Sequence, residues 1–185
     1  MIDEIMAEAR TAMQKSVIAL QNEMGTVRTG RANAHLLDQI RVEYYGTQMP
    51  INQVATVGVP EPRLIALQPW DKSAIPLIEK AILESNLGLT PTNDGTIIRL
   101  PIPQLTEDRR RELVRVVRQY AEESRISVRN TRRDANELIR DAQKEGEIPE
   151  DDARRTTDRV QDLTDEFVAK IDEVLKEKEE EIMEV

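Results

Sequence analysis

Arginine is the residue type whose number and spacing in this sequence most clearly suggest chemistry. Ten of the 19 arginines lie between Arg109 and Arg140. If this segment is helical, each residue turns by about 100°, and eight arginines then fall within roughly 60° of one line. This set, called here the arginine face, is Arg111, Arg115, Arg118, Arg125, Arg129, Arg132, Arg133 and Arg140. A guanidinium group is a planar fork that fits phosphate oxygens and stacks on bases, so the pattern predicts a phosphate-binding surface.

A merely solvated helix face is the alternative explanation. Surface helices are often charged, and Arg–Glu pairs one turn apart are common on them. Solvated faces usually mix the two signs, whereas the acids of this segment gather on a flank. They are Glu112, Glu123, Asp134, Glu137 and Asp141. No DNA-recognition helix pattern or basic arm occurs, and a long stripe suits a folded RNA backbone, so structured RNA is the favoured ligand.

Residues for catalysis or metal binding do not accompany the arginines. The chain has no cysteine and a single histidine, His35, so Ser-His or Cys-His pairs and zinc sites lack parts. Asp151 and Asp152 follow Pro149, which is typical of a helix start. No phosphate-binding glycine motif occurs. Tyr44 or Tyr45 could stack on a base, but packing in a core is the simpler expectation. We therefore expect a binding protein and not an enzyme, with no cofactor and no metal.

Three long helices are predicted by apolar residues at steps of three and four. The first stripe, which ends near Gly30, is Met6, Ala9, Met13, Val17, Leu20, Met24 and Val27. The second, which follows the N-cap residue Thr106, is Leu113, Val117, Tyr120, Ser124, Val128, Thr131, Ala135, Leu138 and Ala142. The third, which follows Pro149, is Ala153, Val160, Leu163, Phe167, Ile171, Val174 and Ile182. The short connection from Gly146 to Pro149 makes the last two helices antiparallel neighbours in a bundle.

The middle of the chain follows a different pattern. Segments 41–45, 54–59, 64–67 and 96–100 are short, apolar or β-branched and bounded by turns, which predicts strands, while 73–85 suggests a short helix. We predict an α+β protein with a long antiparallel three-helix bundle of residues 1–29 and 106–185. A small β/α/β domain of residues 30–105 is inserted into it. The two crossings, near 28–31 and 101–105, would form a hinge at Gly30, Pro101, Ile102 and Pro103.

The net charge of −9 argues against nucleic acid only as an average over the whole surface. Residues 150–185 hold 14 acids and 6 bases, which is most of the excess. The third helix is then either simply solvated or keeps RNA away from its own side. The start Met1-Ile2-Asp3-Glu4 is unlike a secretion signal, and no apolar run reaches the roughly 18 residues of a membrane span. We expect a cytoplasmic monomer that contacts neither membranes nor DNA.

Several motifs resemble the bacterial ribosome recycling factor family. They are RTGRA (28–32), VEYYGT (42–47), SNLGL (85–89), LTEDRR (105–110) and VRNTRRDAN (128–136). The resemblance runs from end to end and implies an L-shaped, tRNA-like protein with a flexible elbow between bundle and small domain. It also implies binding to large-subunit ribosomal RNA on the post-termination ribosome. Elongation factor G and its GTP would be needed to separate the subunits, messenger RNA and deacylated tRNA.

Carried over residue by residue, the resemblance places ribosomal RNA binding at Arg28, Arg31, Arg110, Arg129, Arg132 and Arg133. It places the elbow near Gly30 and at 101–103. Asn33-Ala34-His35 and Trp70 depart from the family pattern, so the small domain's contacts with the partner factor are not carried over. Two rival functions remain: a general RNA chaperone, and a helical adaptor for proteins whose arginine face is only solvated.

Overall fold

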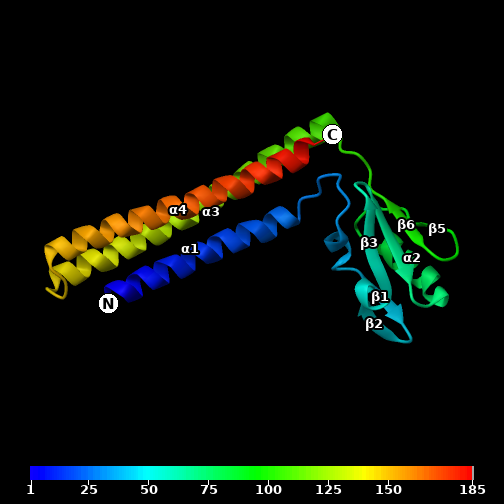
Figure 1. The fold of residues 1–185 in the computed structure, drawn as a ribbon, viewed down its shortest axis with the longest axis horizontal. Coiled ribbons are helices and arrows are strands. Elements are labelled where there is room, and N and C mark those ends of the chain that lie inside the picture. Colours follow the sequence, from blue (N-terminus) through cyan, green and yellow to red (C-terminus); the bar gives the residue numbers. More distant parts are fainter. Residues whose placement is uncertain (185) are drawn as a thin grey trace. The chain divides into compact units, whose positions relative to one another are not determined.

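The computed structural model describes residues 1–184, which divide into two compact units. One unit consists of residues 1–29 and 107–184, and the other is Gly30–Thr106. The first is built from long helices and the second from short strands around one helix (Figure 1). The α+β class with a helical bundle is thereby confirmed.

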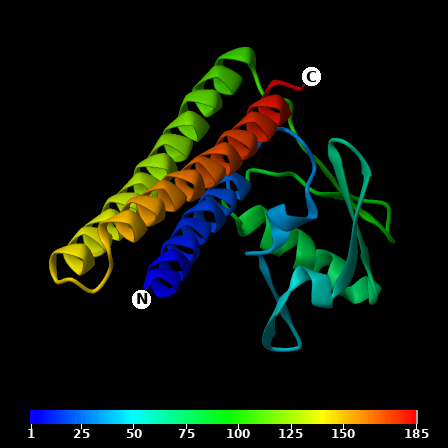
Figure 2. The ribbon, with the colours of Figure 1, turned by 60° about the vertical axis from the view of Figure 1, so that its left-hand side comes forward.

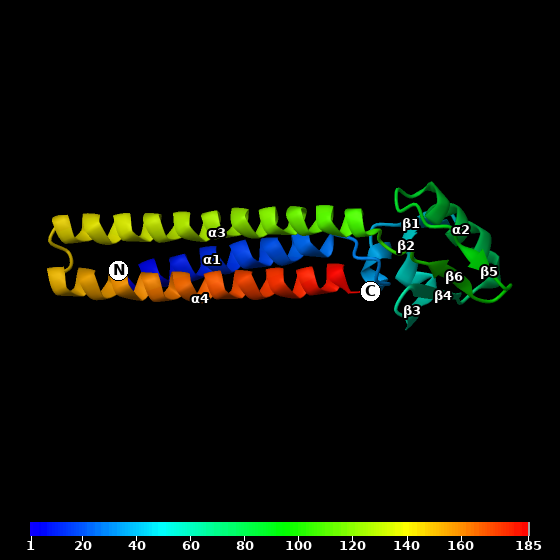
Figure 3. The same cartoon turned by 90° about the horizontal axis from the view of Figure 1, so that it is seen from above.

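The first unit is a three-helix bundle of α1 (Ile2–Gly25), α3 (Glu107–Lys144) and α4 (Glu150–Met183). The three axes run side by side in every view (Figures 2 and 3). A tight turn reverses the chain between α3 and α4. There Gly146 has a φ of 75°, and its N–H and that of Glu147 donate to the carbonyls of Gln143 and Ala142 at 3.0 and 2.9 Å. Glycine is favoured at such a left-handed helix end because it has no Cβ.

Most residues of the predicted apolar stripes are buried in the bundle. At a few positions the buried residue is the sequence neighbour of the predicted one. In α3, Ala121 and Ile139 are buried, whereas the predicted Leu138 is 49% exposed and Tyr120 is only half-buried. In α1, Ile5 is buried in place of Met6. Each of these positions offers two adjacent apolar residues 100° apart, and helix packing selects the one nearer the bundle axis.

Two further corrections concern polar features of the bundle. Helix α1 ends at Gly25 and not near Gly30, because the Thr26 hydroxyl donates to the Glu23 carbonyl at 2.7 Å and closes the last turn. Thr156 and Thr164 are each 2% exposed inside the α4 stripe. Their hydroxyls donate to carbonyls one turn earlier, at 2.7 and 2.8 Å, so burial leaves no hydroxyl unpaired.

The second unit contains a hairpin, a sheet and a helix. The hairpin pairs β1 (Arg41–Tyr44) with β2 (Thr47–Pro50). The antiparallel sheet has the order β3-β4-β6-β5, built from β3 (Ala55–Glu61), β4 (Leu64–Pro69), β6 (Ile98–Pro101) and β5 (Thr92–Asn93). Helix α2 (Ile75–Glu84) packs into the same core. The fully buried side chains at its centre include Ile65, Leu67, Ile78, Ile82, Ile98 and Leu100.

The sequence pattern missed β2 and β5. The turn before β2 is Tyr45-Gly46, with φ of 51° and 77°, so Tyr45 belongs to the turn and not to the predicted strand 41–45. Two residues with positive φ form the tight turn that joins paired strands. Strand β2 ends in Pro50 and has no buried residue, and β5 is two residues long, so neither carries an alternating pattern that could have revealed it.

Candidate nucleic-acid interface

The arginine face lies on α3, which is one unbroken helix of 38 residues. Its buried residues occupy the opposite side of the helix, so the arginines are held along a straight, packed element. Because α3 contacts both other helices of the bundle, this face cannot bend independently of the core. The structure divides its arginines into two rows with different partners.

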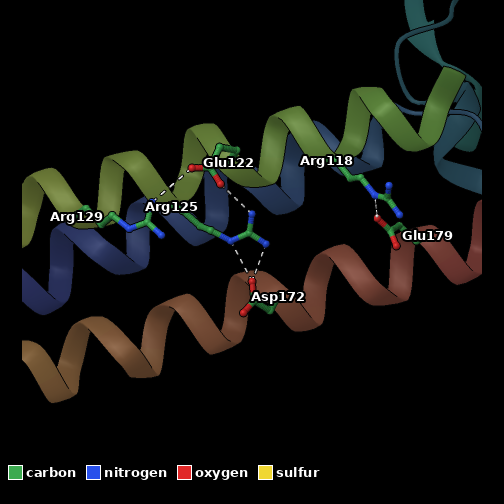
Figure 4. Close-up of polar contacts among 6 residues, drawn as sticks. All are labelled: Arg118, Glu122, Arg125, Arg129, Asp172 and Glu179. Carbon is green, nitrogen blue, oxygen red and sulfur yellow. Dashed lines mark hydrogen bonds and ion pairs between the residues drawn. The ribbon is translucent and has the colours of Figure 1, made fainter.

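The inner row borders α4 and contains Arg118, Arg125 and Arg132, spaced seven residues apart. Nε of Arg118 donates to Glu179 at 2.7 Å. Nε and Nη2 of Arg125 both donate to one oxygen of Asp172, at 3.0 and 2.6 Å (Figure 4). Two turns in α3 match two turns in the antiparallel α4, so these contacts repeat as the rungs of an interhelical ladder.

The third rung runs through an amide. Nη1 of Arg132 donates to the side-chain oxygen of Gln161 at 3.3 Å. The amide nitrogen of Gln161 in turn donates to Asp165 at 2.9 Å. This rung holds Arg132 toward α4 without placing a carboxylate directly on its guanidinium group.

The ladder stabilises the charged form of its arginines. The hydrogen bond that Arg118 donates to Glu179 raises the pKa of Arg118 above its ordinary value. Burial by itself would lower the pKa of Arg125, but hydrogen bonds to Asp172 and Glu122 outweigh it and the pKa rises. The Arg125 side chain is only 19% exposed, so its donors are used within the protein.

The outer row faces solvent and consists of Arg115, Arg129, Arg133 and Arg140. Nη1 of Arg129 makes a long contact of 3.4 Å to Glu122 (Figure 4). Within residues 1–184, no carboxylate lies within 4.0 Å of Arg115, Arg133 or Arg140. All four side chains are exposed. They therefore offer guanidinium donors to a ligand, whereas Arg111 is paired with Glu107 at 2.5 Å.

The six arginines carried over from the family do not form one cluster. Arg129 and Arg133 lie in the outer row and Arg132 in the inner row. Arg110 lies on a different side of α3, about 100° from Arg111, and is half-buried. Its Nε is buried and has no hydrogen-bonding partner among the described residues, and such an orphan donor is unusual in a folded protein.

Arg28 and Arg31 flank the boundary between the two units. Both are exposed, and the residue between them that ends the first unit, Thr29, is 8% exposed. The Thr29 hydroxyl donates to Glu181 of α4 at 2.9 Å. This bond anchors the end of the first crossing segment to the bundle.

Residues on the other side of the boundary are anchored within the second unit. Ile102 N–H donates to the Arg63 carbonyl at 2.8 Å, and Pro101 is the last residue of β6. Gly30 has a φ of 76°, and a Cβ there would approach Leu105 at 3.4 Å.

Gly30→Ala is expected to destabilise the second unit by about 1–2 kcal/mol, because an alanine at positive φ is strained and its Cβ crowds Leu105. Chemical denaturation followed by the single tryptophan, Trp70, measures this. Gly25→Ala is the matched control, since a Cβ at Gly25 meets nothing within 4 Å and its φ is not positive. Equal stability of the two variants would contradict the strain.

Other candidate chemistry is sparse in the described part of the chain. No group of three or more histidine, aspartate or glutamate side chains between residues 1 and 184 could hold a metal ion. Nδ1 of His35 lies 3.0 Å from Oδ2 of Asp38, and the His35 side chain is 82% exposed. None of the helices in residues 1–184 combines the length and the apolar character that crossing a membrane requires.

The contribution of α4 acids to this face was missed from the sequence. The sequence predicts that the helix carrying Asp172 and Glu179 is either simply solvated or keeps RNA away, yet both acids pair with α3 arginines. The signal was available: arginines and acids both recur at steps of seven on two helices predicted to be antiparallel. Register between the helices was the missing information.

Comparison with known proteins agrees with this architecture. Residues 20–183 match the family described as Ribosome recycling factor. The ribosome-recycling factor of Carboxydothermus hydrogenoformans is 56% identical over 185 residues, and that of Bacillus subtilis 55%, each covering 100% of both chains. A solution structure of the ribosome recycling factor has a TM-score of 0.78 and 46% identity, covering 100% of this chain and 98% of that one.

A second solved structure extends the comparison to a complex. It describes models for the T. thermophilus ribosome recycling factor and the E. coli elongation factor G bound to the E. coli post-termination complex. Its TM-score to this chain is 0.67, with 47% identity and 100% of each chain covered.

Proposed function

Since the chain belongs to the ribosome recycling factor family, we propose that it binds the post-termination ribosome. With elongation factor G and GTP, it promotes dissociation of the subunits, messenger RNA and deacylated tRNA. The observation that carries the proposal is the exposed outer row of arginines on the long helix of a family member. The related complex, which contains elongation factor G and a post-termination complex, supports the choice of partners.

Ribosomal RNA of the large subunit is the proposed ligand of the bundle. Outer-row guanidinium groups would form bidentate contacts to phosphates, which are among the stronger hydrogen bonds that proteins make. Arg28, Arg31, Arg110 and Arg132 are proposed as further contacts because they match the family motifs.

The proposed role is mechanical. The bundle anchors the protein on RNA, while the partner factor pushes the second unit about the hinge and hydrolyses the GTP. The continuous core along α1, α3 and α4 supports this division of labour, because close-packed interiors are stiff and transmit strain. The chain itself supplies binding and rigidity and no chemical step.

Subunit splitting tests the proposal directly. Post-termination ribosomes are mixed with the protein, elongation factor G and GTP, and light scattering follows the loss of intact ribosomes. We expect splitting only when all three components are present, because the chain acts by transmitting work done by its partner. A general RNA chaperone would release RNA without the partner or GTP, and that result would overturn the proposal.

Lengthening both crossings is expected to separate binding from splitting. Flexible Gly-Ser insertions after Thr29 and after Leu105 should leave ribosome binding intact but reduce splitting strongly, because a slack joint does not transmit force. Sedimentation measures the binding and light scattering the splitting. A matched insertion within the turn at Gly95, away from both crossings, should leave both unchanged. Full splitting by the doubly lengthened protein would contradict the hinge.

A further inference from the structure

We propose that Asp172 and Glu179 of α4 are specificity determinants that withhold Arg125 and Arg118 from phosphates. RNA then binds through the outer row, and RNA of unrelated sequence binds only weakly. This inference rests on the proposed function, because it concerns how the same face selects its RNA. It assigns a role to the acidic helix, which contains no proposed RNA contact.

The occupied donors are the first step of the argument. Two donors of Arg125 converge on Asp172 and a third, Nη1, reaches Glu122 at 3.1 Å, so its fork is filled within the protein. Arg118 is more exposed, at 64%, but its Nε is bound to Glu179. A phosphate that approached either arginine would have to displace a carboxylate already in place.

Charge balance is the second step. Binding to RNA draws much of its free energy from counterions that cationic side chains displace from phosphates. An arginine that already holds a carboxylate carries its own counterion, so it contributes little to this release. Without α4, Arg118 would have no carboxylate partner within residues 1–184, and Arg125 would have only Glu122. With the ladder in place, both arginines are neutralised by carboxylates of α4.

Geometry is the third step. Arg129 and Arg133 are one helical turn apart, about 6 Å, and Arg140 lies a further 10 Å or so along the axis. The outer row is therefore a single narrow line of charges. It suits an RNA whose folded backbone presents phosphates along one line, whereas a broad basic face would hold any duplex. α4 carries most of the chain's excess of acidic side chains. This acidic helix lies along one side of the arginine face.

The test measures binding to an RNA duplex of unrelated sequence as a function of salt, by fluorescence anisotropy. The variant is Asp172→Asn/Glu179→Gln, which removes two charges and keeps the side-chain shapes. The control is Glu173→Gln/Glu180→Gln, which removes the same charge at the same spacing. Both control residues are exposed, and within residues 1–184 neither has a cation within 4.0 Å.

The ladder variant should bind the duplex more tightly than the wild type. The plot of log affinity against log salt should steepen by about 1–2 units, because one or two arginines now take part in counterion release. The control should keep the slope of the wild type. Equal slopes in the ladder variant and the control would overturn the proposal, since only net charge would then matter.

Loss of the contact between half-buried Arg125 and exposed Asp172 could unfold the double variant, which circular dichroism would reveal. The single variants Glu179→Gln and Glu180→Gln then replace it, because Arg118 is largely exposed and its release strains nothing. A slope steeper by about 1 unit for Glu179→Gln alone supports the proposal, and equal slopes overturn it. Failure of the proposed function has a different signature, namely ribosome binding that does not depend on the outer row.

Discussion

Replacing Arg129 and Arg133 together by alanine is expected to weaken binding to the large ribosomal subunit by at least about a hundredfold. Each charged hydrogen bond to phosphate contributes roughly 1.5–3 kcal/mol, and every 1.4 kcal/mol is tenfold in affinity. These two side chains are exposed in the outer row and one turn apart, so both can reach one RNA strand. Sedimentation with isolated subunits measures the loss.

The matched control for this pair is Arg154→Ala/Arg155→Ala on α4. It removes the same two charges from exposed side chains, whose ion pairs among the described residues are with Glu150 and Asp152 at 3.7 and 4.0 Å. We expect a loss of no more than a few-fold from the changed net charge. If both double variants lose affinity equally, the outer row is an ordinary solvated surface and the adaptor alternative gains support.

Phe167→Ala is expected to destabilise the bundle by about 3–5 kcal/mol, because it removes a large buried ring and leaves a cavity. Phe167 is the only phenylalanine of the chain and is 0% exposed. Lys170 Nζ lies 4.5 Å from the ring centroid and the Arg10 guanidinium 5.9 Å, so cation–π contacts are lost as well. Urea unfolding followed by far-ultraviolet circular dichroism measures the change, since the bundle holds most of the helix.

An ion-pair cluster covers this ring, and its contribution should be small by comparison. Glu166 pairs with Arg10 at 3.3 Å and with Lys170 at 3.4 Å, and the hydrogen bond from Arg10 lowers the pKa of the Glu166 carboxyl. Such exposed pairs contribute little to stability. Leu138→Ala, at a side chain that is 49% exposed, is the control and should change stability by less than about 1 kcal/mol. If Leu138→Ala lost as much stability as Phe167→Ala, Phe167 would not be a central residue of the bundle core.

Architecture was predictable from the sequence where the local signals were strong. Thr106, Gly146 and Pro149 delimit α3 and α4 because cap residues act within a few positions of each other along the chain. The hydrophobic repeats of these helices indicated a bundle. The strands β3, β4 and β6 carry enough apolar residues to be recognised, and the family motifs are local by nature.

The site was predictable only in part, because its details depend on distant contacts. Periodicity placed the arginines on one face, but the split into two rows requires Arg125 to meet Asp172, 47 residues away. The register of one helix against another fixes that meeting, and it is set by packing of the whole core. The same limit applies to Leu138 and Ile139, since either could have pointed inward until the bundle was assembled.

The ladder between α3 and α4 also has an evolutionary consequence. Positions 118 and 179, and positions 125 and 172, should change together among relatives, because a reversed or neutral pair keeps the rung while a single change breaks it. Among residues 1–184, outer-row arginines have no carboxylate partner on α4, so we expect them to vary only as the RNA that they are proposed to contact varies. On the proposed function, we expect the two rows of one helix face to be under separate selection, one from the protein's own fold and one from the ribosome.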